Sequence, residues 1–227
     1  MTIPRSFLQS YRDFYTHFFI VVKDKGCSPQ GLEFTTTQQG KNSWLIELEE
    51  PIHLSRWPIM PYTSVDISVH AAFHCGQRQG VFVHTKSSVY LTYFRRHERR
   101  KTAEPMENVR FDYHPDVDDA AHPLLHAHIF ANEPPNSIPQ PLEKNCTIDW
   151  EPLEQRLNSF RVPVPNMTLP SVLCCLVASH LGANEIKKLL ELTKKIRGSF
   201  SDLAIIDTQK DLFYTNSLAG AQWFERS

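Results

Sequence analysis

The chain has 227 residues and a formal net charge of -1, with 41% hydrophobic, 11% aromatic and 22% charged residues. This balance excludes wholesale disorder, and a chain of this length accommodates one large core better than two, so we expect a single α+β domain over residues 1–227. The near-neutral charge excludes a global attraction to nucleic acid or anionic membranes, which leaves only local clusters as binding candidates.

The first predicted element is an amphipathic helix from about residue 5 to 22. Apolar residues such as Phe7, Tyr11, Phe14 and Phe18 recur there at spacings of three and four. A stripe of this kind is what a helix needs in order to pack on a core. We therefore interpret the aromatic residues as core rather than as a ligand site.

After this helix the pattern changes to alternation of apolar and polar residues, which is typical of strands with one buried face. Val65, Ile67 and Val69 illustrate it. Predicted strands lie near residues 44–48, 65–75, 81–94, 108–114 and 124–131, with a kink expected near Thr85 to Ser88. Because the strands follow one another along the chain, we predict an antiparallel β-meander of about five strands.

Four prolines between Glu133 and Leu142 exclude regular structure near 133–142, where we expect a surface linker between the sheet part and the helical C-terminal part. A short helix is predicted near 152–160. Longer helices are predicted near 169–181, capped by Thr168 and ended by Gly182, and near 184–197. The fold class is therefore α+β, with an N-terminal helix and a helical C-terminal half. The predicted core includes Phe14, Phe18, Val69, Leu91, Phe111, Ile129, Leu173 and Leu176.

The strands near 108–114 and 124–131, which we call the histidine hairpin, carry the densest group of histidines. Alternation places Arg110, Asp112 and His114 on one face of the first strand, and it places His126 and His128 on one face of the second. If the two strands pair, residues whose numbers sum to about 238 to 240 lie opposite each other. We therefore expect all five residues to share one surface.

Imidazoles and a carboxylate on one surface can support two kinds of chemistry. His114, His126 and His128, joined by His122 from the connecting loop, can bind zinc or another divalent transition metal. Alternatively, Asp112 can orient a histidine as general base, which gives Asp112, His114, His126 and His128 as a catalytic set. The remaining interpretation is a half-exposed polar face with no site.

The main run of positive charge consists of Arg95, Arg96, Arg99, Arg100 and Lys101, which we place in the turn between two predicted strands. Cations beside aromatic residues can hold the phosphates and bases of nucleic acid. The alternative is a solvated hairpin tip, which the near-neutral charge of the whole chain favours.

No stretch reads as a signal sequence or a membrane span, and the five cysteines lack the spacing of a disulfide framework. We therefore expect a cytoplasmic protein with free thiols and no membrane partner.

Two functions are compatible with these features. The first is a non-catalytic interaction subunit or adaptor of a larger intracellular, bacterial-type protein or nucleoprotein assembly. It would have protein partners and no cofactor, and would contact nucleic acid through residues 95–101. The second is a His/Asp-dependent hydrolase of phosphodiester or nucleotide substrates, with or without a metal such as zinc. The lack of a complete catalytic motif favours the first.

Overall fold

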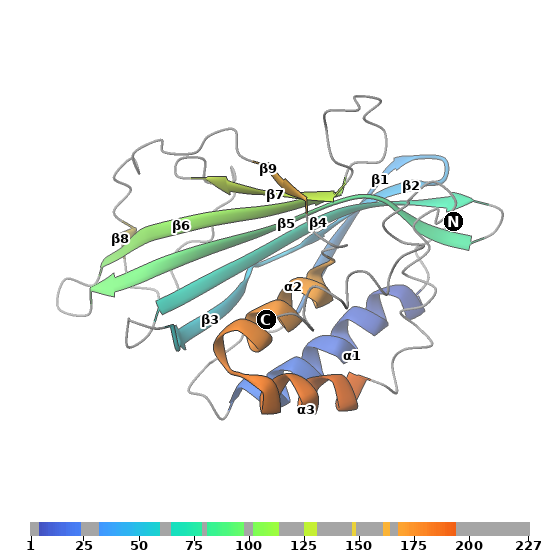
Figure 1. Cartoon of the computed structure of the whole chain (residues 1–227). Coiled ribbons are helices and arrows are strands. Elements are labelled where there is room, and N and C mark those ends of the chain that lie inside the picture. Colours follow the sequence, from blue (N-terminus) through green and yellow to red (C-terminus); the bar gives the residue numbers. More distant parts are fainter. Residues whose placement is uncertain are drawn as a thin grey trace.

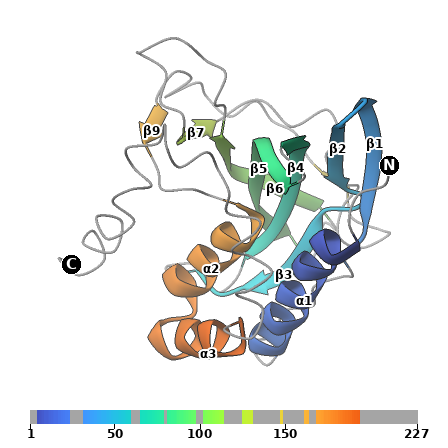
Figure 2. The same cartoon turned by 90° about the vertical axis from the view of Figure 1, so that its right-hand side faces the viewer.

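Three helices cover one face of a large antiparallel sheet in the computed structural model (Figure 1). A view turned by 90° shows all three helices on the same side of the sheet (Figure 2). The structure describes residues 5–23, 32–59, 65–78, 81–97, 102–113, 125–130, 147–148, 161–163 and 168–193. The predicted linker near 133–142 and the predicted helix near 152–160 lie outside these ranges.

Within these ranges the sheet has nine strands, seven of which follow one another in the order β1-β2-β4-β5-β6-β7-β9. The strands are β1 (Phe34–Gly40), β2 (Ser43–Leu48), β3 (Ile52–Trp57), β4 (Val65–Arg78), β5 (Val81–His97), β6 (Thr102–Tyr113), β7 (Leu125–Phe130), β8 (Thr147–Ile148) and β9 (Arg161–Pro163). All pairs are antiparallel except β6 with β8. The predicted α+β class and the predicted meander are confirmed, while β1, β3, β8 and β9 add to the strands expected.

The 14 residues of β4 are enough to pair with two strands along one edge. One half of β4 pairs with β2, and the other half pairs with β3. Pro51 lies between β2 and β3, and it has no backbone N–H to contribute to a ladder. The interruption at this proline explains why two short strands occupy the place of one long one.

The strand predicted over 81–94 continues as β5 to His97. Arg95 and Arg96 therefore lie in the strand and not in the turn, which corrects the prediction. Arg95 is the register partner of Glu104 on β6, and opposite charges in that position stabilise a strand pair. The kink predicted near Thr85 is confirmed, because the register between β4 and β5 shifts there.

The helices are α1 (Arg5–Val22), α2 (Leu169–His180) and α3 (Ala183–Thr193), close to the predicted ranges, although residues 194–197 are not described. Thr168 caps α2 as predicted, since its side chain accepts a hydrogen bond from the backbone N–H of Ser171 at 3.4 Å. Gly182 has a φ of 102°, a conformation that favours glycine, and it turns the chain from α2 into α3.

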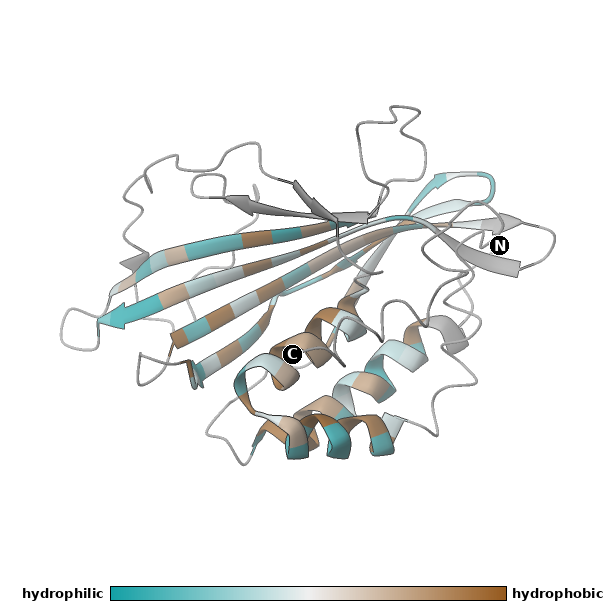
Figure 3. Cartoon of the chain, viewed as in Figure 1, coloured by the Kyte–Doolittle hydropathy of each residue, from teal (hydrophilic) through white to brown (hydrophobic). Residues whose placement is uncertain are grey.

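A single buried cluster joins the helices to the sheet, and apolar residues alternate with polar ones along the strands (Figure 3). The predicted core residues Phe14, Phe18, Val69, Leu91, Leu173 and Leu176 are all buried. Phe111 is partly buried and packs against the cluster. The Ile129 side chain lies outside the described part. None of the three described helices is both long and apolar enough to span a membrane.

Candidate functional site

The face of the sheet opposite the helices is polar, and we call it the polar face. Strand alternation sends odd-numbered residues of β4 such as Val69 into the helix-covered core. The even-numbered residues at 66–74 of β4, 86–94 of β5 and 108–112 of β6 then point to the other side, because register shifts change the parity beyond these ranges. Several of these are polar and nevertheless buried, including Ser68, Thr92, Asn108 and Asp112.

In the pairing of β6 with β7, even-numbered residues lie opposite even-numbered residues, as predicted for the histidine hairpin. Asp112 is the Cα partner of His126, and Arg110 is the partner of His128. His114 and His122 lie outside the described residues, as do the side chains of His126 and His128, so the catalytic and metal-binding sets remain predictions. Within the described ranges, no group of three or more His, Cys, Asp or Glu residues is placed to hold a metal ion.

One line of register partners crosses five strands of the polar face and contains only aromatic or basic residues. We call it the basic-aromatic row. His70 on β4 is the partner of Tyr90 on β5, and Tyr90 is the partner of Arg110 on β6. Arg110 is followed by His128 on β7 and by Arg161 on β9. Neighbouring strands lie about 4.8 Å apart, so the row extends over roughly 19 Å.

Ring and charge contacts organise the centre of this row. The Arg110 guanidinium carbon lies 5.8 Å from the Tyr90 ring centroid, a distance at which a cation interacts with the face of an aromatic ring. The His70 ring centroid lies 6.3 Å from that of Tyr90. Burial lowers the pKa of His70, while the nearby Glu47 carboxylate opposes this shift. The Tyr90 ring therefore lies between the His70 imidazole and the Arg110 guanidinium.

The carboxylate of Asp112 holds the guanidinium of Arg110 in place. Its side chain is buried, with the residue only 3% exposed, and its Oδ2 accepts a hydrogen bond from Arg110 Nε at 2.7 Å. Its Oδ1 accepts a second bond from Ser88 Oγ at 2.6 Å. Both carboxylate oxygens thus accept hydrogen bonds, one from within β6 and one from the neighbouring strand β5. This geometry positions the guanidinium of Arg110 on the polar face.

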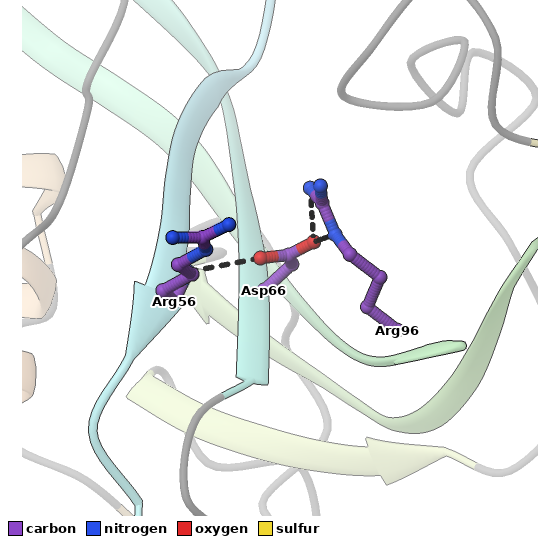
Figure 4. Close-up of polar contacts among 3 residues, drawn as sticks. All are labelled: Arg56, Asp66 and Arg96. Carbon is purple, nitrogen blue, oxygen red and sulfur yellow. Dashed lines mark hydrogen bonds and ion pairs between the residues drawn. The ribbon is translucent and has the colours of Figure 1, made fainter. Parts of the chain in front are cut away.

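A second buried carboxylate, Asp66, holds the other end of the polar face (Figure 4). Asp66 is 1% exposed, and its Oδ2 lies 2.7 Å from Arg96 Nε and 2.6 Å from Arg96 Nη2. Its Oδ1 accepts a hydrogen bond at 2.9 Å from the backbone N–H of Arg56, which has an unusual φ of 55°. Asp66 therefore stabilises both the irregular end of β3 and the guanidinium of Arg96.

The predicted nucleic-acid-binding residues are thus in different situations. Arg95 is exposed, whereas the Arg96 side chain is largely buried in its ion pair with Asp66. Arg99, Arg100 and Lys101 lie outside the described residues. Binding of nucleic acid by this run remains a prediction, and replacement of Arg96 would also affect stability.

Sequence reasoning missed His53, which lies on the polar face opposite Ser68. It is 5% exposed, and within the described chain neither imidazole nitrogen has a hydrogen-bond partner. Burial, and secondarily the positive charge of Arg96, lowers the pKa of His53 to about 3. The pattern of Ile52 and Leu54 around a polar residue was the available signal, but three alternating positions are too few to identify a strand.

Comparison of the chain with models of protein families, with curated proteins and with solved structures found no match. The geometry of the polar face is therefore the basis from which a function is inferred.

Proposed function

We propose that the chain is a non-catalytic interaction subunit or adaptor of a nucleoprotein assembly, and that its polar face binds single-stranded nucleic acid. The observation that carries the proposal is the basic-aromatic row across β4, β5, β6, β7 and β9. Sheets that bind single strands use aromatic side chains to stack bases and cations to contact phosphates. Tyr90 and Arg110 supply one of each at the centre of the row.

The role of Asp112 supports binding rather than catalysis. In the catalytic alternative, Asp112 would orient a histidine that acts as general base. Both Asp112 oxygens instead accept hydrogen bonds from Arg110 and Ser88, which position the guanidinium. A guanidinium held in place in this way loses little conformational entropy when it binds a phosphate.

Binding of a fluorescein-labelled oligouridine at low salt, followed by anisotropy, tests the proposal. Tyr90→Leu should weaken binding about tenfold to a hundredfold, because stacking of a base on an aromatic ring contributes about 1–3 kcal/mol. Tyr93→Leu is the matched control. Tyr93 lies on the same strand but packs against the core on the helix side, so its replacement should leave the affinity of the folded protein unchanged.

Affinity of the wild-type protein should also fall steeply as salt is added, because cations of the protein displace counterions from the phosphates. Absence of binding at low salt, or equal losses in the Tyr90 and Tyr93 variants, would contradict the proposal.

A second candidate is the His/Asp-dependent hydrolase, and the register that sets His126 opposite Asp112 favours it. A histidine oriented by a carboxylate can act as general base on a phosphodiester. Incubation of the same oligonucleotide with the protein, with and without added zinc, separates the two functions. An intact oligonucleotide supports the adaptor, whereas cleavage that His126→Ala abolishes would support the hydrolase.

A further inference from the structure

β1 lies at one end of the strand order, so one of its edges is open. Among the described strands, it pairs with β2 alone. Every residue from Thr35 to Gly40 is exposed. The outer backbone N–H and C=O groups of such a strand are available to pair with another strand.

From Phe34 to Gln38, this open edge lacks the features that usually prevent pairing between sheets. Natural edge strands are protected by lysine, proline, inward-pointing charge or a bulge. The residues Thr35, Thr36, Thr37, Gln38 and Gln39 include no charge and no proline. The β1–β2 register is continuous from Phe34 to Gln38 and shifts only before Gly40. Three consecutive threonines also favour an extended strand.

We propose that β1 pairs antiparallel with β1 of a second copy of this chain, around a two-fold axis at Thr37. An isologous contact brings the residue on the axis next to its own copy, so a charge there would repel itself. Thr37 is uncharged and is the middle residue of the seven in β1, which gives the greatest overlap. The formal net charge of -1 adds little repulsion between the copies.

Pairing of this kind makes one continuous sheet of two copies. The two-fold axis is then perpendicular to the sheet, so both polar faces are on the same side. The inference stands independently of the proposed function. If both hold, however, one dimer presents two basic-aromatic rows to one strand of nucleic acid, and the two contacts reinforce each other.

Sedimentation velocity over a range of concentrations tests the inference. The wild-type protein should form a dimer as its concentration rises. Thr37→Lys should remain a monomer, because two lysines would meet at the axis. Asn184→Lys is the control, since it adds the same charge at an exposed position of α3 and should still dimerise. Circular dichroism confirms that both variants fold.

Mixing Thr37→Lys with Thr37→Glu should restore a dimer, because opposite charges then face each other across the axis. A wild-type protein that stays monomeric at every concentration would overturn the inference. Dimerisation of Thr37→Lys to the same extent as Asn184→Lys would also overturn it.

Discussion

His53 illustrates how a single buried group links stability to pH. Its pKa in the folded protein is about 3, lowered first by burial and then by the charge of Arg96. A histidine in an unfolded chain has a pKa near 6.5, so between these two values the unfolded state binds the proton and the folded state does not. Stability contributed by the neutral imidazole is therefore present above about pH 6.5 and is lost as the pH falls toward 3.

We expect the free energy of unfolding to decrease by up to about 1.4 kcal/mol per pH unit below pH 6.5 because of His53. His53→Gln removes this titration and should reduce the slope, while His70, His74 and His180, whose pKa values burial also lowers, keep their own contributions. Urea unfolding between pH 7 and pH 4 measures this dependence of the free energy of unfolding on pH. Equal slopes for wild type and His53→Gln would contradict this account.

The ion pair of Asp66 with Arg96 is largely removed from solvent, so breaking it leaves a buried charge without its partner. Asp66→Asn keeps an acceptor for the Arg56 N–H but removes the carboxylate charge. We expect a loss of about 3–5 kcal/mol in urea unfolding, because an uncompensated buried charge is costly. Arg96→Met in the same chain should recover part of it, since no charge then remains unpaired.

A surface pair supplies the comparison. The Arg12 and Glu33 side chains are 39% and 69% exposed, and their charges lie 3.3 Å apart. Glu33→Gln should cost less than about 1 kcal/mol, because water screens exposed pairs. A loss as large as that of Asp66→Asn would show that burial does not set the difference.

At the scale of the elements, strands and helices with one buried face could be predicted, and those without could not. Apolar residues recur in α1 at the spacing of a helix, and they alternate with polar residues in β4 as in a strand with one buried face. β1 has only one partly buried residue, Phe34, followed by six exposed ones, so no alternation marks it. β3 is short and lies between Pro51 and Pro58, residues that normally argue against a strand.

The turn from α2 to α3 depends on a backbone conformation that glycine adopts readily. Gly182 has a φ of 102°, so a Cβ at this position is strained even though its nearest neighbour, Glu185 Oε2, would be 3.9 Å away. We expect Gly182→Ala to lower the free energy of unfolding by about 1 kcal/mol or more.

Gly40→Ala is the matched control for this substitution. A Cβ there would meet only Ser43 Cβ at an ordinary 3.7 Å, and Gly40 does not share the positive φ. It should be neutral or slightly stabilising in the same urea titration. Equal destabilisation by the two substitutions would show that backbone conformation is not the cause.

At the scale of the whole molecule, the sequence predicted the candidate site only where the alternation of side chains along two neighbouring strands determines which residues share a face. Parity within the histidine hairpin correctly placed Asp112 opposite His126 and Arg110 opposite His128. The continuation of the row to Tyr90 and His70 depends on the registers of three long strands, one of which is shifted near Thr85. The sequence predicted a kink near Thr85 but not the pairing on either side of it, because one residue more or less in a turn or bulge changes every partner that follows.

The arrangement of strands also predicts how stability is distributed through the sheet. Most of β4, and β5 from Ser87 to His97, have neighbours on both sides, so the amides there are largely bonded in ladders. β1 has one described neighbour, and its outer amides face solvent. In dilute protein, hydrogen exchange measured by mass spectrometry should therefore be slowest in β4 and β5 and fast in β1.

The dependence of β1 hydrogen exchange on protein concentration distinguishes an open edge from an edge paired with a second copy. If copies associate through β1, its outer amides gain acceptors, and their exchange should slow as the protein concentration rises while that of β4 stays constant. In Thr37→Lys the exchange of β1 should be fast at every concentration. Protection of β1 in dilute protein equal to that of β4 would contradict both the open edge and the distribution of stability that follows from it.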